Sequence, residues 1–208
     1  ALGPVRVVLS LSAWWRAFAA LGVALCRGGL ANGDVVGRVV ALLKRRRVAA
    51  ALVSSGGSTI YGLGAPSGRK AWEVTLQDPL DSRKAATTVT LKDRAVSVAG
   101  RSEKSFESGG VPYSHIMDPR TGWPAQGVLS VAVLTSTGTA GDALDDALFV
   151  MGPERSRRYL KTLPGTEALF FLPDAPRGGR LARLPLGCLW GRAPDALGVH
   201  LRDVDTMC

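Results

Sequence analysis

The clustering of strand-like segments, without regular alternation with helices, most constrains what this chain can fold into. Runs of β-branched and apolar residues between turn signals predict strands over residues 49–55, 72–77, 86–91, 94–99, 128–135 and 168–172. Apolar residues at helical spacing predict helices over residues 34–47, 139–151 and 153–163. Such an arrangement indicates an α+β fold rather than a doubly wound α/β sheet.

The net charge of the chain indicates which kinds of molecule it could bind. Among 208 residues, Lys and Arg number 26 against 17 Asp and Glu, so the formal net charge is +9. This balance favours anionic partners, which include nucleic acid, a membrane surface and a small phosphorylated ligand. Aromatic residues make up only 6% of the chain, and the densest basic run, at residues 44–47, lies at a predicted helix end, where it complements the helix dipole. We therefore expect no nucleic-acid partner.

The two ends of the chain differ from the middle. Residues 7–26 are apolar and long enough to resemble a membrane or signal segment, but Arg16 interrupts them and Leu25 before Cys26 suits lipoprotein cleavage poorly. A buried helix, or leftover sequence that folds poorly, explains the stretch at least as well, so membrane association stays open and localisation is unassigned. We expect an atypical segment over residues 1–27, a domain over 28–175 and an irregular tail over 176–208.

Two acids four residues apart mark the start of the predicted helix 139–151. Asp142 and Asp146 share a helix face, where like charges repel unless a cation lies between them. Mg²⁺ suits such a pair, because it takes one or two carboxylates and completes its shell with phosphate oxygens and water. The other interpretation is a helix start in which Thr139 is the N-cap and Asp142 completes a capping box.

A polar, turn-rich loop predicted over residues 108–127 contains His115, one of only two histidines. A histidine there can act as a general acid or base, or orient a ligand. The sequences Asp118-Pro119 and Thr121-Gly122 are typical of turns, so a structural role also explains this segment.

Two glycine tracts add candidate ligand contacts. Gly56 and Gly57 follow the strand 49–55 and either permit close approach of the backbone to a ligand or simply turn the chain. Residues 28–34 precede the first predicted helix. They either place backbone amides near a phosphate or form an ordinary loop and helix cap.

The order of these motifs resembles the ApbE family of flavin transferases. The resemblance rests on Gly-Leu-Ala-Asn-Gly at residues 29–33, the strand into Gly56-Gly57, Trp72 with Asp78-Pro79, Ser-His-Ile-Met-Asp-Pro-Arg-Thr-Gly at 114–122, and Asp-Ala-Leu at 142–144. Segment 114–122 is the most specific of them. The resemblance covers residues 28–172 and implies the family's fold, with mixed and antiparallel sheets flanked by helices.

The resemblance also implies an activity, a Mg²⁺-dependent FAD:protein FMN transferase. In that family a Thr or Ser hydroxyl of an acceptor protein attacks the FMN-side phosphorus of FAD, and AMP leaves. By position, the implied magnesium ligands are Asp142, Asp146 and the backbone carbonyl of Ala31. The implied flavin-nucleotide contacts are Asp34, Gly57, Ser58 and Ile116. His115 is implied to assist deprotonation of the acceptor hydroxyl or to orient the phosphates.

Several positions depart from the family's pattern. Asn32 stands where a Lys usually precedes Gly33, Ser58 stands for an acidic or amide residue, and Asp146 stands for a Thr. Family members are also usually longer at the N-terminus, so the resemblance implies an N-terminally truncated member. Two alternatives follow: a non-catalytic flavin-binding module, and a Mg²⁺-dependent FAD pyrophosphatase that uses water as the nucleophile.

Overall fold

A six-stranded antiparallel sheet forms the centre of the protein. The computed structural model describes residues 7–9, 16–18, 28–100, 105–108, 111–173 and 181–183. The sheet has the strand order β14-β13-β12-β7-β4-β3. In chain order its strands are β3 (Ala51–Ser55), β4 (Thr59–Leu63), β7 (Arg94–Gly100), β12 (Ser130–Thr135), β13 (Glu167–Pro173) and β14 (Leu181–Arg183).

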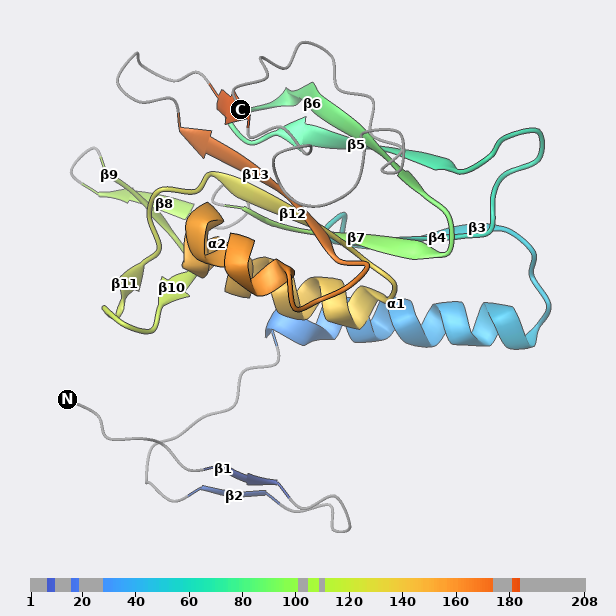
Figure 1. The fold of residues 1–208 in the computed structure, drawn as a ribbon, viewed down its shortest axis with the longest axis horizontal. Helices are drawn as coiled ribbons and strands as arrows, with labels where there is room; N and C mark the ends of the chain where they lie inside the picture. Colours follow the sequence, from blue (N-terminus) through green and yellow to red (C-terminus); the bar gives the residue numbers. More distant parts are fainter. Residues whose placement is uncertain are drawn as a thin grey trace.

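Different elements cover the two faces of this sheet, as Figure 1 shows. On one face lies a long hairpin of β5 (Trp72–Asp78) and β6 (Asp81–Leu91). On the other lie the helices α1 (Gly28–Arg45) and α2 (Gly138–Leu160). The predicted α+β class is confirmed, and every pairing within the central sheet is antiparallel.

Successive side chains of β12 point to opposite faces of the sheet and contribute to an apolar core on each face. Ala132 and Leu134 belong to the apolar cluster that includes the β5–β6 hairpin. Val131 and Val133 point the other way and pack in the cluster that includes Leu148 of α2. Successive side chains of a strand point to opposite faces, so one central strand contributes to both cores.

Helix α1 covers the β3–β4 side of the sheet. Val36 and Val40 are buried in a cluster with Tyr61 and Leu63 of β4. The last turn of α1 carries Lys44 and Arg45, as predicted from the basic run, and these charges complement the helix dipole.

Several element boundaries differ from the sequence prediction. Helix α1 begins at Gly28 rather than at residue 34, and strand β4 was not predicted. The predicted loop 108–127 holds β9 (Val111–Ser114), which pairs with β8 (Ser105–Ser108), and a small hairpin of β10 (Met117–Asp118) and β11 (Trp123–Pro124). The two helices predicted over 139–151 and 153–163 are present as two parts of α2, with non-helical backbone at Gly152 between them.

Only short pieces of the two chain ends are described. Strands β1 (Val7–Leu9) and β2 (Arg16–Phe18) pair antiparallel, so a helix through those residues is a wrong interpretation. The remainder of segment 1–27 and most of the tail 176–208 lie outside the described residues. Within the part of the chain that the structure describes, no helix is long and apolar enough to cross a membrane.

Candidate functional site

Gly29 and Gly33 lie where α1 contacts α2 directly. A Cβ atom on Gly33 would lie 2.4 Å from the carbonyl oxygen of Gly138 and 2.7 Å from the Cβ of Asp142. A Cβ on Gly29 would lie 3.1 Å from Oδ2 of Asp146. The tract 28–34 was interpreted as a loop or cap, but it is helical. Gly33 is needed because the backbone of Gly138 approaches closely there, whereas Gly29 faces the Asp146 carboxylate and has non-helical backbone angles.

The carboxylate of Asp142 faces this glycine segment. Its Oδ2 accepts a hydrogen bond from the backbone N–H of Gly33 at 2.9 Å, and the residue is only 4% exposed. The capping-box interpretation is wrong, because the N-cap of α2 is Thr137, whose Oγ1 accepts from the N–H of Ala140 at 3.2 Å. Asp142 and Asp146 therefore both face α1, as their spacing predicted.

A third acid, Asp145, was not singled out from the sequence. It is 3% exposed, and its Oδ2 accepts from the Oγ of Ser97 on β7 at 2.7 Å. Its Oδ1 accepts from the N–H of Asp146 at 2.6 Å. Burial raises the pKa of Asp145 to about 7; the Ser97 hydrogen bond opposes this rise, and the charges of Asp146 and Asp142 add to it. Three acids within residues 142–146 were the available signal, but the sequence does not show which one turns toward the sheet.

His115 comes close enough to α2 to interact with Asp146. Burial raises the pKa of Asp146, the nearby His115 opposes the rise, and the charge of Asp142 adds to it. His115 itself is exposed, between the buried residues Ser114 and Ile116. Ser114 Oγ accepts from the N–H of Ile116 at 3.1 Å, and the carbonyl of Ile116 accepts from the N–H of Ala125 at 2.9 Å. These bonds fix the backbone on which His115 is carried.

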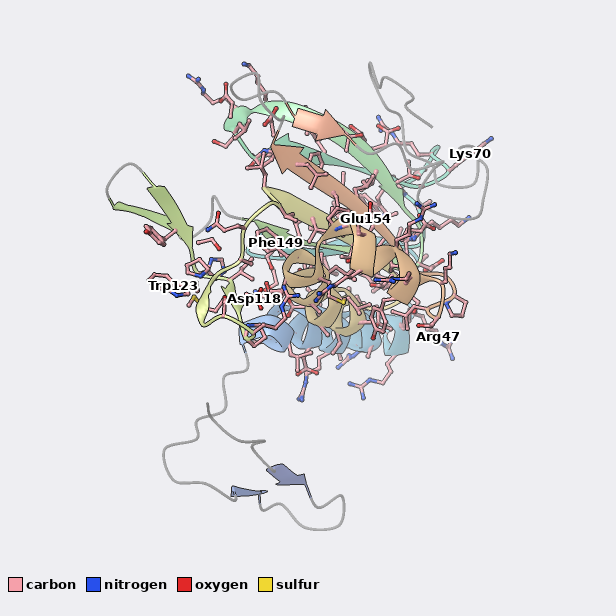
Figure 2. The ribbon with its side chains drawn as sticks, turned by 60° about the vertical axis from the view of Figure 1, so that its left-hand side comes forward. Arg47, Lys70, Asp118, Trp123, Phe149 and Glu154 are labelled. Carbon is pink, nitrogen blue, oxygen red and sulfur yellow. The ribbon has the colours of Figure 1, made fainter. Side chains whose placement is uncertain are left out.

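The turn after His115 is fastened to α2. Arg120 forms a bidentate ion pair with Asp118 and also donates to the carbonyl oxygen of Val150 at 3.3 Å. The side-chain hydrogen bond from Arg120, aided by the N–H of the same residue, lowers the pKa of Asp118 to about 2. The turn interpretation of this segment is confirmed, since the N–H groups of Thr121 and Gly122 both donate to the Asp118 carbonyl. Figure 2 shows Asp118 and Trp123 together on this side of the molecule, where Trp123 is 66% exposed.

The remaining predicted residues are divided between this region and the outer surface. Gly57 and Ser58 form part of the β3–β4 turn, and the Nδ2 of Asn32 in α1 donates to Ser58 Oγ at 3.3 Å. Ala31 is exposed in the same part of α1. Asp34 lies on the exposed side of α1 in an ion pair with Arg38, so the structure does not bring it to Asp142 and Asp146.

The carboxylate oxygens at the helix crossing, where α1 meets α2 near Gly33, suit a hard cation. Asp142 and Asp146 supply carboxylate oxygens, the ligand type that Mg²⁺ prefers. Within the described ranges, no group of three or more His, Cys, Asp or Glu side chains is arranged to hold a metal ion. Two carboxylates therefore fit Mg²⁺ only if backbone, phosphate or water oxygens complete its shell. The assignment of Asp142, Asp146 and Ala31 as ligands stays a prediction.

Comparison with known proteins assigns the family. The ApbE family profile matches residues 4–170 of this sequence. The chain belongs to the ApbE family. The match begins nearer the N-terminus than the ApbE motifs recognised over residues 28–172. The fold agrees as well: the crystal structure of the ApbE protein from Thermotoga maritima has a TM-score of 0.74 and 30% identity, over 90% of this chain and 59% of that one.

Curated ApbE relatives carry the name FAD:protein FMN transferase. The Treponema pallidum protein is 39% identical over 163 residues, which make up 74% of this chain and 45% of that protein. The Rhodobacter capsulatus protein is 34% identical, over 73% of this chain and 28% of that protein. The present ApbE chain thus spans about half the length of these relatives or less.

Proposed function

We propose that this chain is a Mg²⁺-dependent FAD:protein FMN transferase. It moves FMN from FAD to a Thr or Ser hydroxyl of an acceptor protein and releases AMP. The observation that carries the proposal is the buried hydrogen bond from the Gly33 N–H to Asp142 Oδ2, at the crossing where Asp146 also faces α1. Membership of the ApbE family supports this choice of reaction, since the curated relatives bear that name.

The residues of the crossing have distinct tasks in this proposal. Asp142, Asp146 and the carbonyl of Ala31 would hold Mg²⁺, which would offset charge on the FAD diphosphate and stabilise the transition state. Ile116, the turn residues Gly57 and Ser58, and Asp34 line the flavin nucleotide. Of these, Asp34 has the weakest support, because it is exposed and paired with Arg38.

His115 serves the acceptor hydroxyl. The imidazole lies near Asp146, where it takes the hydroxyl proton or orients the phosphates. The acceptor oxygen forms the new bond to the FMN-side phosphorus. The bond from that phosphorus to the AMP oxygen breaks, and AMP leaves with the electron pair. This step is a phosphoryl-type transfer, in which positioning and charge stabilisation provide most of the catalysis.

Isothermal titration of the chain with FAD, with and without Mg²⁺, tests the proposal. We expect magnesium-dependent binding in the wild-type chain and its loss in Asp142→Ala. Glu154→Ala is the matched control, because Glu154 is an exposed acid in the second part of the same helix. Asp142→Asn keeps an oxygen that can accept from Gly33, so it separates loss of the metal ligand from loss of the helix contact. No binding to a folded wild-type chain would overturn the proposal.

A transfer assay then distinguishes the three activities that this site could support. FAD, Mg²⁺ and a Thr-containing acceptor peptide are incubated with the chain, and the products are analysed by mass spectrometry. FMN on the peptide together with AMP supports the transferase. AMP without flavinylated peptide indicates a pyrophosphatase. Binding without AMP indicates a flavin-binding module.

A further inference from the structure

The side chain of Asn32 connects α1 to both ends of the β3–β4 turn. Ser55 Oγ donates to Asn32 Oδ1 at 3.0 Å, and Asn32 Nδ2 donates to Ser58 Oγ at 3.3 Å. The backbone N–H of Ser58 closes the turn by donating to the carbonyl of Ser55 at 3.1 Å. Both polar groups of one carboxamide are therefore used on a single turn.

The two glycines at the tip of the turn have no side chains with which to pack. Gly56 and Gly57 have φ angles of 60° and 82°, and a Cβ atom on either would meet nothing within 4 Å. Glycine accepts these angles freely but contributes no side chain to pack. The polar bonds at Ser55 and Ser58 therefore determine where the tip lies relative to α1.

Ser58 is also bound from the opposite side. Its carbonyl accepts from the N–H of Val98 on β7 at 2.9 Å. Ser97, the neighbouring residue of β7, donates to Asp145 of α2 and has its Oγ 3.4 Å from the same Ser58 carbonyl. The turn thus lies in a polar network that begins at Asn32 on α1 and ends at Asp145 on α2.

We propose that Asn32 is a positioning residue of the site. Its carboxamide holds the β3–β4 turn against the part of α1 that contacts Asp142, so the turn and the two helices present one fixed surface to the phosphates of the ligand. Asn32 acts through Ser58 and α1 and does not touch the reacting atoms. This role rests on the proposed function for its ligand. The clamp, meaning the hydrogen bonds of Asn32 to Ser55 and Ser58, can be tested without any ligand.

Hydrogen exchange of the full chain, measured by mass spectrometry, tests the clamp. We expect faster exchange in peptides that span residues 55–59 in Asn32→Ala and in Ser58→Ala. Ser58→Thr keeps the hydroxyl and should restore the wild-type rate. Ser54→Ala is the control, because Ser54 is exposed on the opposite face of β3 from Ser55. Wild-type exchange in both Asn32→Ala and Ser58→Ala would overturn the clamp, and Ser58→Ala tests it alone if Asn32→Ala fails to fold.

Titration with FAD and Mg²⁺ tests the positioning role. The loss of one or two hydrogen bonds predicts a Kd that is roughly five- to tenfold higher in Asn32→Ala. In a Ser58→Ala background, Asn32→Ala should raise the Kd less than it does alone, because the two changes break the same contact. Faster exchange with unchanged affinity would overturn the positioning role and leave a purely structural clamp. A wild-type chain that binds no FAD refutes the proposed function, and the positioning role with it, while the exchange data still decide the clamp.

Discussion

Gly33 shows how a single missing side chain can determine the arrangement of a site. Its backbone lies so close to Gly138 that any Cβ would overlap the carbonyl of that residue. The same closeness lets its N–H reach Asp142 across a separation of 109 residues in the chain. The carboxylate is thereby fixed at the helix crossing rather than at the helix cap.

Gly33→Ala should therefore destabilise the protein by about 2–4 kcal/mol, since α1 and α2 must separate to accommodate the methyl group. Gly37→Ala is the control, because its Cβ would meet only Thr139 Oγ1 at 3.5 Å. Alanine also favours helix over glycine, so that control should gain about 0.5–1 kcal/mol. Urea unfolding of both variants measures the difference. Equal stabilities would contradict the close helix contact.

Asp145→Asn should change how stability depends on pH. Burial raises the pKa of Asp145 to about 7 in the folded protein, above the ordinary aspartate value of about 3.9. The folded state therefore binds more protons than the unfolded state between these values, and wild-type stability falls as pH rises through this window. Asparagine has no such titration, and its amide can donate to Ser97 Oγ while its oxygen accepts from the Asp146 N–H.

We expect Asp145→Asn to be more stable than the wild type above pH 7, by about 1–3 kcal/mol. The advantage should shrink as pH falls toward 4. Thermal unfolding from pH 4 to pH 8, in magnesium-free buffer, measures it. A difference that does not vary with pH would show that Asp145 is not buried as a high-pKa carboxyl.

Among the single elements, helix α2 is interrupted by non-helical backbone at Gly152. This residue has φ 70° and ψ 171°, a conformation open essentially to glycine only. Pro153 follows and suits the first position of the second helical part. The carbonyl of Val150, just before the break, accepts the hydrogen bond from Arg120. The break thus leaves a helix end to which the turn after His115 is fastened.

Gly152→Ala should cost about 1–3 kcal/mol through backbone strain, although a Cβ there would meet nothing within 4 Å. Gly37→Ala again serves as the control, being the same substitution at a glycine within helix α1. Hydrogen exchange in peptides spanning residues 116–125 should also become faster, because the anchor of Arg120 shifts. A neutral effect on both stability and exchange would refute the strained break.

On the scale of the whole molecule, one sheet joins two cores. The cluster with the β5–β6 hairpin contains Leu91, and the cluster with α2 contains Leu148; both residues are fully buried. Strand β12 contributes alternate residues to each cluster. Loss of either core should therefore lower the stability of the whole sheet.

Leu91→Ala and Leu148→Ala should each lower the free energy of unfolding by about 2–5 kcal/mol, in one cooperative transition. Leu52→Ala, on edge strand β3 and 43% exposed, should cost well under half as much. Tryptophan fluorescence and far-UV circular dichroism, recorded on the same urea series, check this. Two separated transitions would indicate two independent folding units instead of one.

Within single elements, the sequence determined much of this structure. Runs of β-branched and apolar residues between turn signals predicted the strands β5, β7, β12 and β13, since such residues suit a buried pleated sheet. The spacing of Asp142 and Asp146 predicted their common face, because the helical repeat fixes it. The order of motifs predicted the ApbE family, which the profile match confirms.

Contacts between residues far apart in the chain could not be predicted from the sequence. The glycine tract 28–34 was interpreted as a loop because glycine disfavours helix locally, but it lies within α1, where Gly33 approaches α2 too closely for a side chain. Asp145 turned out to face Ser97, and Asp142 to bind Gly33 rather than cap its own helix. These contacts join residues that are 48 and 109 positions apart. Local periodicity describes one element at a time, whereas packing energy between elements is defined only once the chain has folded.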